Sequence, residues 1–133
     1  MDGLLLDRSS PRAGLKTILE AITLIKSGRS CIIYPEGTRS KTKDMLPFKQ
    51  GSLKLASKSN VPIVPISVLG TEDVFESNYI NLSPDTVYIT VGEPIYLDQL
   101  SKEDQLKSAP YIQKVIEKMY KEQLELQRLA KQS

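Results

Sequence analysis

The sequence of 133 residues contains no histidine, no tryptophan and one cysteine. Without histidine, a serine triad that depends on an imidazole base cannot form. The lone Cys31 cannot make a disulfide within the chain, and no Cys/His cluster is present to bind zinc. Cys31 lies in an apolar stretch, so we interpret it as a small buried hydrophobic residue; a nucleophilic role is the alternative.

Aromatic residues are also few, and the net charge is small. Aromatics make up 6% of the chain and the formal charge is +2, so neither base stacking nor a strong positive field indicates a nucleic-acid partner. No apolar run approaches the roughly 20 residues of a membrane-spanning helix. Asp2, Asp7 and Arg8 interrupt the first apolar stretch too early for a signal peptide. Any membrane contact is therefore expected to be peripheral.

Several well-known binding motifs are missing as well. The glycine-lysine-serine P-loop and the three-glycine dinucleotide fingerprint are absent from the sequence. There is no Gly-x-Ser-x-Gly elbow, and no spaced set of acidic residues suggests a calcium loop. The sequence therefore predicts neither a resident metal nor a bound cofactor.

What is present is the composition and patterning of an ordinary soluble domain, with 40% hydrophobic and 26% charged residues. A chain of this length fits one domain over residues 1–133. Strands alternate with helices, which predicts an α/β fold with a central, mostly parallel sheet flanked by helices. The expected strands are Gly3–Leu6, Ser30–Tyr34, Val61–Leu69 and Thr86–Val91, with a short extension at Ile95–Leu97.

Three helices are expected beside these strands. The first is entered at Ser9-Ser10-Pro11 and closed at Ser27-Gly28. The second spans Gln50–Lys58 and ends at Ser59-Asn60. The third is a terminal amphipathic helix over residues 110–131, preceded by a weak capping pattern of Ser101 with Asp104. Because a core strand occupies the first residues, we expect the domain to be partial and truncated at its N-terminus.

The run Tyr34-Pro35-Glu36-Gly37-Thr38-Arg39-Ser40 is the most informative motif. It follows the apolar Cys31-Ile32-Ile33 and places a carboxylate, a glycine, a hydroxyl and a guanidinium on successive positions. An arginine with neighbouring hydrogen-bond donors suits a phosphate monoester, because its guanidinium binds phosphate oxygens in a bidentate fork. A commonplace turn is the alternative interpretation.

Two other segments end in cationic groups. Asp7-Arg8 closes the first expected strand, and Phe48-Lys49-Gln50-Gly51 leads into a helix whose first amides can hold an anion. The alternative interpretation of Asp7-Arg8 is a solvated charge pair, and that of Phe48–Gly51 is an ordinary turn and helix cap. Loops that follow neighbouring strands of an α/β sheet gather at one edge. We therefore hypothesise that Arg8, Arg39 and Lys49 face a single phosphate.

With these motifs in place, the sequence resembles the glycerol-phosphate acyltransferases of phospholipid synthesis, closest to the 1-acylglycerol-3-phosphate acyltransferases. Gly3–Arg8 resembles the second sequence block of that family, Tyr34–Ser40 the third and Val61–Ile66 the fourth. Pro47–Gly51 resembles the spacer that follows the third block. The first block, Asn-His-x4-Asp, is absent, so the resemblance is to the C-terminal portion of such an enzyme.

The resemblance implies a role for each matching residue. Arg8 and Arg39 would hold the phosphate of the acceptor, Glu36 would orient the acceptor or brace the arginine, and Gly37 and Thr38 would shape the turn and donate hydrogen bonds. The proline-rich strand would line the acyl side of the site. The family's general base is the histidine of the missing block, so no catalytic residue is assigned and the chain alone is expected to be inactive.

The resemblance also implies the partners and the location. The substrates would be lysophosphatidic acid or a related lysophospholipid and an acyl thioester of coenzyme A or acyl carrier protein. The protein would lie peripherally on the cytoplasmic face of a membrane. Two alternatives remain open: a non-catalytic module that binds phospholipid or an anionic membrane through its basic loop and terminal helix, and an unrelated sugar-phosphate binder.

Overall fold

The computed structural model describes residues 11–37, 44–71 and 86–132. These residues form two compact units. The first contains the described residues up to Pro62 together with Tyr96–Ala109, and the second contains Ile63–Ile95 and the chain from Pro110 onward. The prediction of one domain over residues 1–133 stays a prediction, and each unit is considered by itself.

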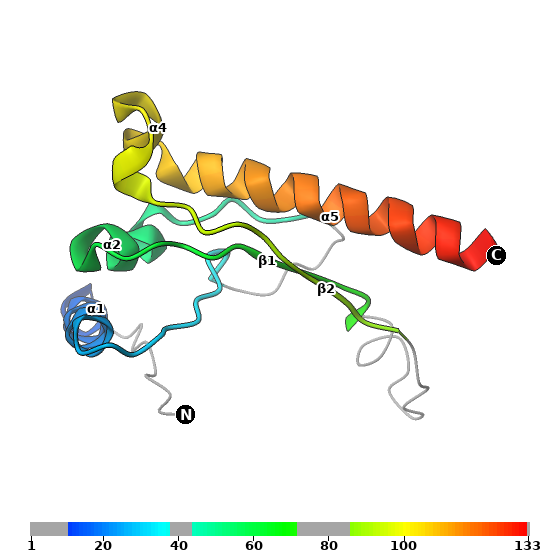
Figure 1. Ribbon diagram of the computed structural model, residues 1–133. Coiled ribbons are helices and arrows are strands. Elements are labelled where there is room, and N and C mark those ends of the chain that lie inside the picture. Colours follow the sequence, from blue (N-terminus) through cyan, green and yellow to red (C-terminus); the bar gives the residue numbers. More distant parts are fainter. Residues whose placement is uncertain (1–10, 38–43, 72–85, 133) are drawn as a thin grey trace, which may run out of the picture. The chain divides into compact units, whose positions relative to one another are not determined.

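Helix α1, Pro11–Lys26, opens the described part of the first unit. Its apolar residues recur at helical spacing, and Ala21 among them is only 6% exposed. The helix packs against helix α2, Gln50–Ser59 (Figure 1). The helix ends where Gly28 adopts a φ of +97° and the Arg29 amide donates to Leu24 O at 3.2 Å. The predicted helix and its glycine stop are confirmed, whereas the cap at Ser9-Ser10 lies outside the described residues.

Helix α2, Gln50–Ser59, confirms the second predicted helix almost to the residue. Leu53 is its anchor in the core, with 2% of its surface exposed. Asn60 ends the helix in the left-handed region, with φ 53°, and its amide donates to Ala56 O. The short helix η1, Leu97–Gln99, packs beside α2 and buries Leu97.

Helix α4, Lys102–Leu106, follows η1 within the same unit. The predicted Ser101–Asp104 capping pair is formed, because the Ser101 hydroxyl accepts from the Asp104 amide at 3.2 Å, but it caps this separate short helix, which the sequence did not predict. Helix α5, Ser108–Gln132, begins directly afterwards and covers the whole range of the predicted terminal helix.

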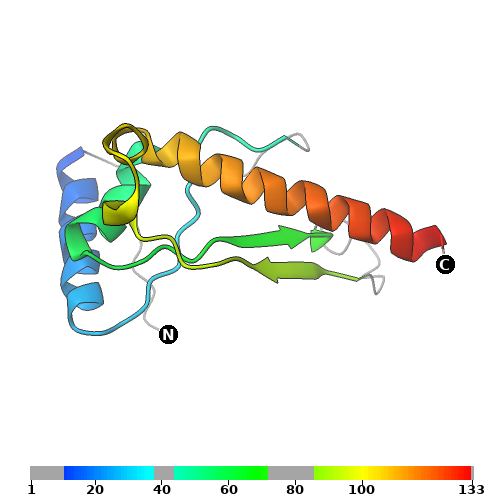
Figure 2. The same cartoon turned by 45° about the horizontal axis from the view of Figure 1, so that its top comes forward.

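Strands β1, Ile66–Leu69, and β2, Tyr88–Val91, form the sheet of the second unit. They pair antiparallel, with Ile66 opposite Val91 and Val68 opposite Ile89. Figure 2 shows the two strands side by side along α5. Leu69 of β1 and Ile112 and Met119 of α5 supply the buried apolar side chains of this unit.

The opposite face of this hairpin is aliphatic and open. Because successive strand side chains alternate between faces, Ile66 and Val68 share one face with Ile89 and Val91. These four side chains are between 43% and 65% exposed. Val64, 46% exposed, continues the same spacing before β1.

The strand predictions need three corrections. Residues Ser30–Tyr34 form no strand, and Cys31 and Ile32 are exposed rather than buried, with Ile32 at 64%. A strand is held by hydrogen bonds to a neighbour, and within the described ranges no strand pairs with this segment. Its expected neighbour, Gly3–Leu6, lies outside those ranges.

The second correction concerns direction, and the third concerns length. The mixed helix and sheet class is confirmed, but the single described strand pair is antiparallel rather than parallel. Val61–Leu69 is a regular strand only from Ile66, because Pro62 and Pro65 have no amide to donate; before that, Ile63 and Ile95 form an isolated bridge. Similarly, β2 begins at Tyr88 rather than Thr86, and the extension expected at Ile95–Leu97 is not a strand, because Leu97 already begins η1.

Candidate functional site

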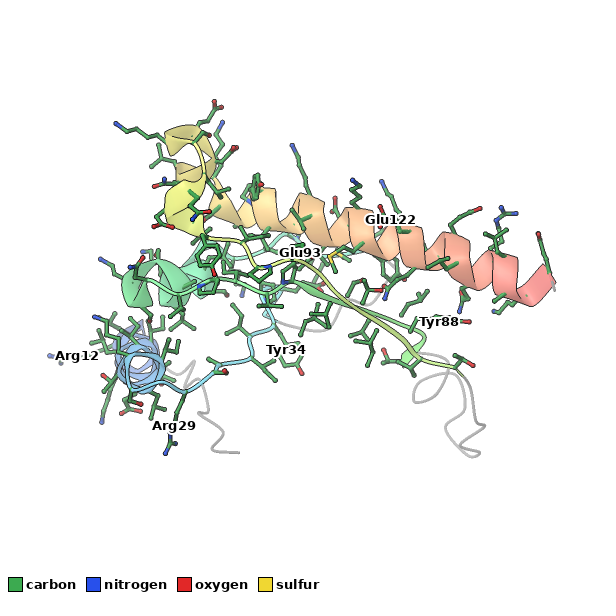
Figure 3. The ribbon with its side chains drawn as sticks, viewed as in Figure 1. Arg12, Arg29, Tyr34, Tyr88, Glu93 and Glu122 are labelled. Atoms are coloured by element: carbon green, nitrogen blue, oxygen red, sulfur yellow. The ribbon has the colours of Figure 1, made fainter. Side chains whose placement is uncertain are left out.

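The centre of the candidate site is a tight turn over Tyr34–Gly37. The Gly37 amide donates to Tyr34 O at 3.0 Å, which closes the turn. Pro35 at its second position has a fixed φ suited to this turn, and Gly37 adopts a φ of +73° that a side chain would strain. Figure 3 shows Tyr34 projecting from the segment that enters the turn, and its side chain is 83% exposed.

Glu36 holds the far end of the loop that follows the turn. Its Oε2 atom accepts a hydrogen bond of 2.9 Å from the Leu46 amide, ten residues along the chain. A carboxylate that accepts from an amide makes a stronger bond than a neutral oxygen does. Glu36 therefore braces backbone, whereas the predicted brace to Arg39 involves a residue outside the described part.

Lys49 meets the same turn from the start of α2. Its amide donates to Pro35 O at 2.9 Å, so the two ends of the loop are joined by backbone as well. Its side chain covers Gly37: a Cβ added there would lie 3.0 Å from Lys49 Nζ and 3.1 Å from Cε. The structure thus brings Glu36, Gly37 and Lys49 together, three of the six predicted site residues.

The other three predicted residues, Arg8, Thr38 and Arg39, lie outside the described residues. Thr38 and Arg39 directly follow Gly37 in the chain, so the turn and the Lys49 side chain mark the start of the segment that contains them. The hypothesis that two arginines and Lys49 share one phosphate remains a prediction.

The first turn of α2 adds further positive potential. Lys49 is its N-cap, with extended dihedrals and no side-chain cap, and the first turn contains no acidic residue. The amides at the start of a helix carry a partial positive charge that favours anions. The cationic Lys49 and these amides therefore act in the same direction.

Gln50 is a residue of this region that the sequence did not single out. Its Nε2 donates to Ser108 Oγ at 2.8 Å, and its Oε1 accepts from the Ala109 amide at 3.0 Å. One side chain thus ties the start of α2 to the start of α5. Its place directly after Lys49 is the only sequence signal, because its partners lie more than fifty residues away.

Residues 1–69, just over half of the chain, match the family described as Acyltransferase, and this range includes every predicted site residue from Arg8 to Lys49. The chain belongs to the acyltransferase family.

Similarity to individual acyltransferases supports this assignment. The chain is 38% identical over 99 residues to a 1-acyl-sn-glycerol-3-phosphate acyltransferase of Cocos nucifera, covering 74% of the chain and 32% of that protein. It is 33% identical over 115 residues to the enzyme of that name from Escherichia coli, covering 86% and 46%. Among solved structures, the 1-acyl-sn-glycerophosphate (LPA) acyltransferase PlsC from Thermotoga maritima matches with a TM-score of 0.71 at 32% identity, covering 82% of this chain and 44% of PlsC. The chain therefore spans from 32% to 46% of the length of these acyltransferases.

A hollow of about 390 Å³ also exists in the first unit of this acyltransferase chain. It lies between α2 and η1 and is lined by polar and apolar side chains, among them Lys54, Asn60, Tyr96 and Asp98. It contains none of the predicted site residues, so the turn and α2 start remain the candidate site. Within the described ranges, no group of His, Cys, Asp or Glu side chains is arranged to hold a metal ion.

Proposed function

We propose that this chain is part of an enzyme that transfers a fatty acyl group to the free hydroxyl of 1-acylglycerol 3-phosphate and so forms phosphatidic acid. Membership of the acyltransferase family and the names of the relatives support the reaction. The donor would be a thioester of coenzyme A or acyl carrier protein, which is a second substrate rather than a resident cofactor.

In this reaction the acceptor hydroxyl attacks the thioester carbonyl, the thiolate leaves and the hydroxyl proton passes to a base. None of the 133 residues is histidine. Lysine is protonated at neutral pH unless it is strongly desolvated, and an ordinary carboxylate is a weak base. We therefore infer that this chain binds the acceptor phosphate and does not turn over by itself.

The observation that carries the binding proposal is the contact between Lys49 and the turn. The Lys49 ammonium lies over Gly37, whose missing side chain leaves room for it. A phosphate placed beside this turn would meet that cation and the positive end of α2. Arg8 and Arg39 would complete the phosphate clamp.

The aliphatic face of the β1–β2 hairpin supports a second part of the proposal. Val64, Ile66 and Val68 belong to the strand that the family resemblance places on the acyl side, and they are exposed together with Ile89 and Val91. Side chains without a polar group suit contact with a fatty acyl chain.

Phosphate binding is tested with the chain itself. Amide chemical shifts of the ¹⁵N-labelled chain are followed during titration with glycerol 3-phosphate, with glycerol as the control ligand. We expect Gly37 and Lys49 to shift with glycerol 3-phosphate alone. Lys49→Gln should weaken binding about tenfold or more, because it removes a charged hydrogen-bond donor. Lys58→Gln, in the last turn of α2, is the matched control. Equal binding by both variants would contradict the role of Lys49.

Turnover is tested separately with a long-chain acyl thioester and 1-acylglycerol 3-phosphate. We expect release of free thiol no faster than with heat-denatured chain. Faster release would overturn the inference that the chain is inactive alone, but it would leave phosphate binding in place.

The proposal includes a peripheral location on the cytoplasmic face of a membrane, where both lipids of the reaction reside. In the described ranges, no helix is long and apolar enough to cross a bilayer. A non-catalytic module that binds anionic lipid is the second candidate function, since it needs cations and no general base.

A further inference from the structure

Helix α1 presents an exposed face whose composition is unusual. Residues on it follow one another at intervals of three or four, or are direct neighbours, so they form one stripe along the helix. The members of this outer face of α1 are all exposed: Arg12, Leu15, Lys16, Leu19, Thr23 and Lys26. Leu15 and Leu19 each leave 56% of their surface uncovered. The packing against α2 is made by the other side of the helix, where Ala21 is buried.

The charges on this face are of one sign. Arg12, Lys16 and Lys26 are its cations, and Glu20, beside the face, is the only acidic residue of α1. Figure 3 shows the Arg12 side chain near the start of α1. The ion pairs Lys107–Glu103 and Arg128–Glu125 both lie outside α1. The Thr23 hydroxyl donates a hydrogen bond of 3.1 Å to Leu19 O within the same helix.

Two of the exposed leucines of α5 have a different setting. Leu126 and Leu129 are 60% and 50% exposed, comparable with those of α1. Glu122 and Glu125 lie on the same stretch of α5, and Arg128 donates to Glu125. Exposed leucine surrounded by both signs of charge has no preference for an anionic partner, whereas leucine on a face with three cations and one acidic residue at its edge does.

We propose that the outer face of α1 docks on an anionic lipid surface. Leu15 and Leu19 enter the boundary between head groups and acyl chains, while the three cations lie among the lipid phosphates. The helix lies in the plane of the surface, because its opposite side is packed against α2. This inference rests on the proposed peripheral membrane contact and is independent of acyl transfer.

The test is sedimentation of the chain with vesicles at low ionic strength. Vesicles of phosphatidylcholine and phosphatidylglycerol in equal parts are compared with pure phosphatidylcholine. We expect strong preference for the anionic vesicles. The triple change Arg12→Gln, Lys16→Gln and Lys26→Gln should lower partitioning about a hundredfold, at about fivefold per cation. Leu15→Gln with Leu19→Gln should lower it about twentyfold, since half of each side chain no longer gains from burial.

Matched variants on α5 show whether the position of the cations and exposed leucines matters, or only how many of them the chain has. Lys118→Gln, Lys121→Gln and Lys131→Gln remove the same charge, and Leu126→Gln with Leu129→Gln remove the same exposed leucine area. Glutamine is a good helix former at exposed sites, so every variant should retain the helical circular dichroism of the parent chain. We expect the α5 variants to lose no more than about twofold in partitioning, the size of a weak long-range charge effect.

Each outcome is decisive. Losses confined to the α1 variants support the inference. Equal losses from both helices, or binding of the parent chain that no α1 variant weakens, overturn it and leave the membrane contact in place. Failure of the parent chain to bind either vesicle overturns both the contact and this inference, whereas the phosphate-binding proposal is unaffected.

Discussion

Gln123 of α5 and Ser67 of β1 hold each other through two hydrogen bonds, although 56 residues separate them. The Ser67 hydroxyl donates to Gln123 Oε1 at 2.6 Å, and Gln123 Nε2 donates to Ser67 O at 3.0 Å. Nε2 also reaches Tyr88 O at 3.2 Å and Thr90 Oγ1 at 2.8 Å. Both Ser67 and Gln123 are 2% exposed. One amide thus fastens both strands of the hairpin to the terminal helix.

The first prediction concerns this buried network. Gln123→Ala should lower the free energy of unfolding by about 3 kcal/mol, because it leaves buried oxygen atoms of two strands without a donor. In a double-mutant cycle, Gln123→Ala and Ser67→Ala should show a coupling of about 1–2 kcal/mol. The measurement is urea denaturation of the four chains.

Gln105→Ala is the control for this cycle. Gln105 also donates from its amide to two backbone oxygens, those of Asp98 and Leu100, but it is exposed to water. Its replacement should cost only about 0.5 kcal/mol, since water can replace the lost partner. A cost at Gln123 no larger than at Gln105, or a coupling near zero, would show that the network adds nothing to stability.

A second prediction addresses the turn at Gly37. Gly37→Ala should cost about 1–3 kcal/mol, since alanine at a φ of +73° is strained. The new methyl would also meet the end of the Lys49 side chain at 3.0 Å and displace the ammonium. We expect the affinity for glycerol 3-phosphate to fall together with the melting temperature.

Gly51→Ala provides the comparison for that change. An added Cβ at Gly51 meets nothing within 4 Å, and Gly51 lies in helix α2. Alanine there should stabilise the chain by about 0.5–1 kcal/mol. The special role of Gly37 would be disproved if both substitutions raised the melting temperature.

A third prediction concerns the loop that Glu36 braces. Glu36→Ala removes the acceptor of the Leu46 amide and should speed hydrogen exchange at that amide about tenfold, the effect of losing a charge-assisted bond. Glu36→Gln retains an acceptor oxygen and should restore most of the protection. An unchanged exchange rate in the alanine variant would mean that the bond is not formed in solution.

The sequence predicted helices α1, α2 and α5, though not the short η1 and α4, because the signals of the longer helices are local. Gly28 and Asn60 end α1 and α2 through their own backbone conformations, and Ser101 caps α4 three residues from its partner. The strand at Ser30–Tyr34 failed for the opposite reason. Its apolar residues satisfy the pattern, but a strand depends on a partner, and pattern alone cannot supply one.

The site was predicted only in part, again because local signals are visible in the sequence and distant partners are not. Glu36, Gly37 and Lys49 belong to two short motifs that a single loop joins, so the motifs alone predicted that these residues share a site. Gln50 and Gln123 were missed because polar residues in a helical pattern read as solvent-facing. Only their distant partners, Ser108 and Ser67, reveal that these amides are used inside the structure.

The fourth prediction follows from Gln50. The α5 helix begins at Ser108, and the Gln50 carboxamide accepts from the amide of its second residue, Ala109, as a cap supplied from another helix. Gln50→Ala should lower the free energy of unfolding by about 1–2 kcal/mol and speed hydrogen exchange at Ala109. Gln50→Glu retains the acceptor, and the Ser108 hydroxyl can turn to donate, so most of the stability should return. If glutamate proved as damaging as alanine, or if exchange at Ala109 were the same in all three chains, Gln50 would not be the cap of α5.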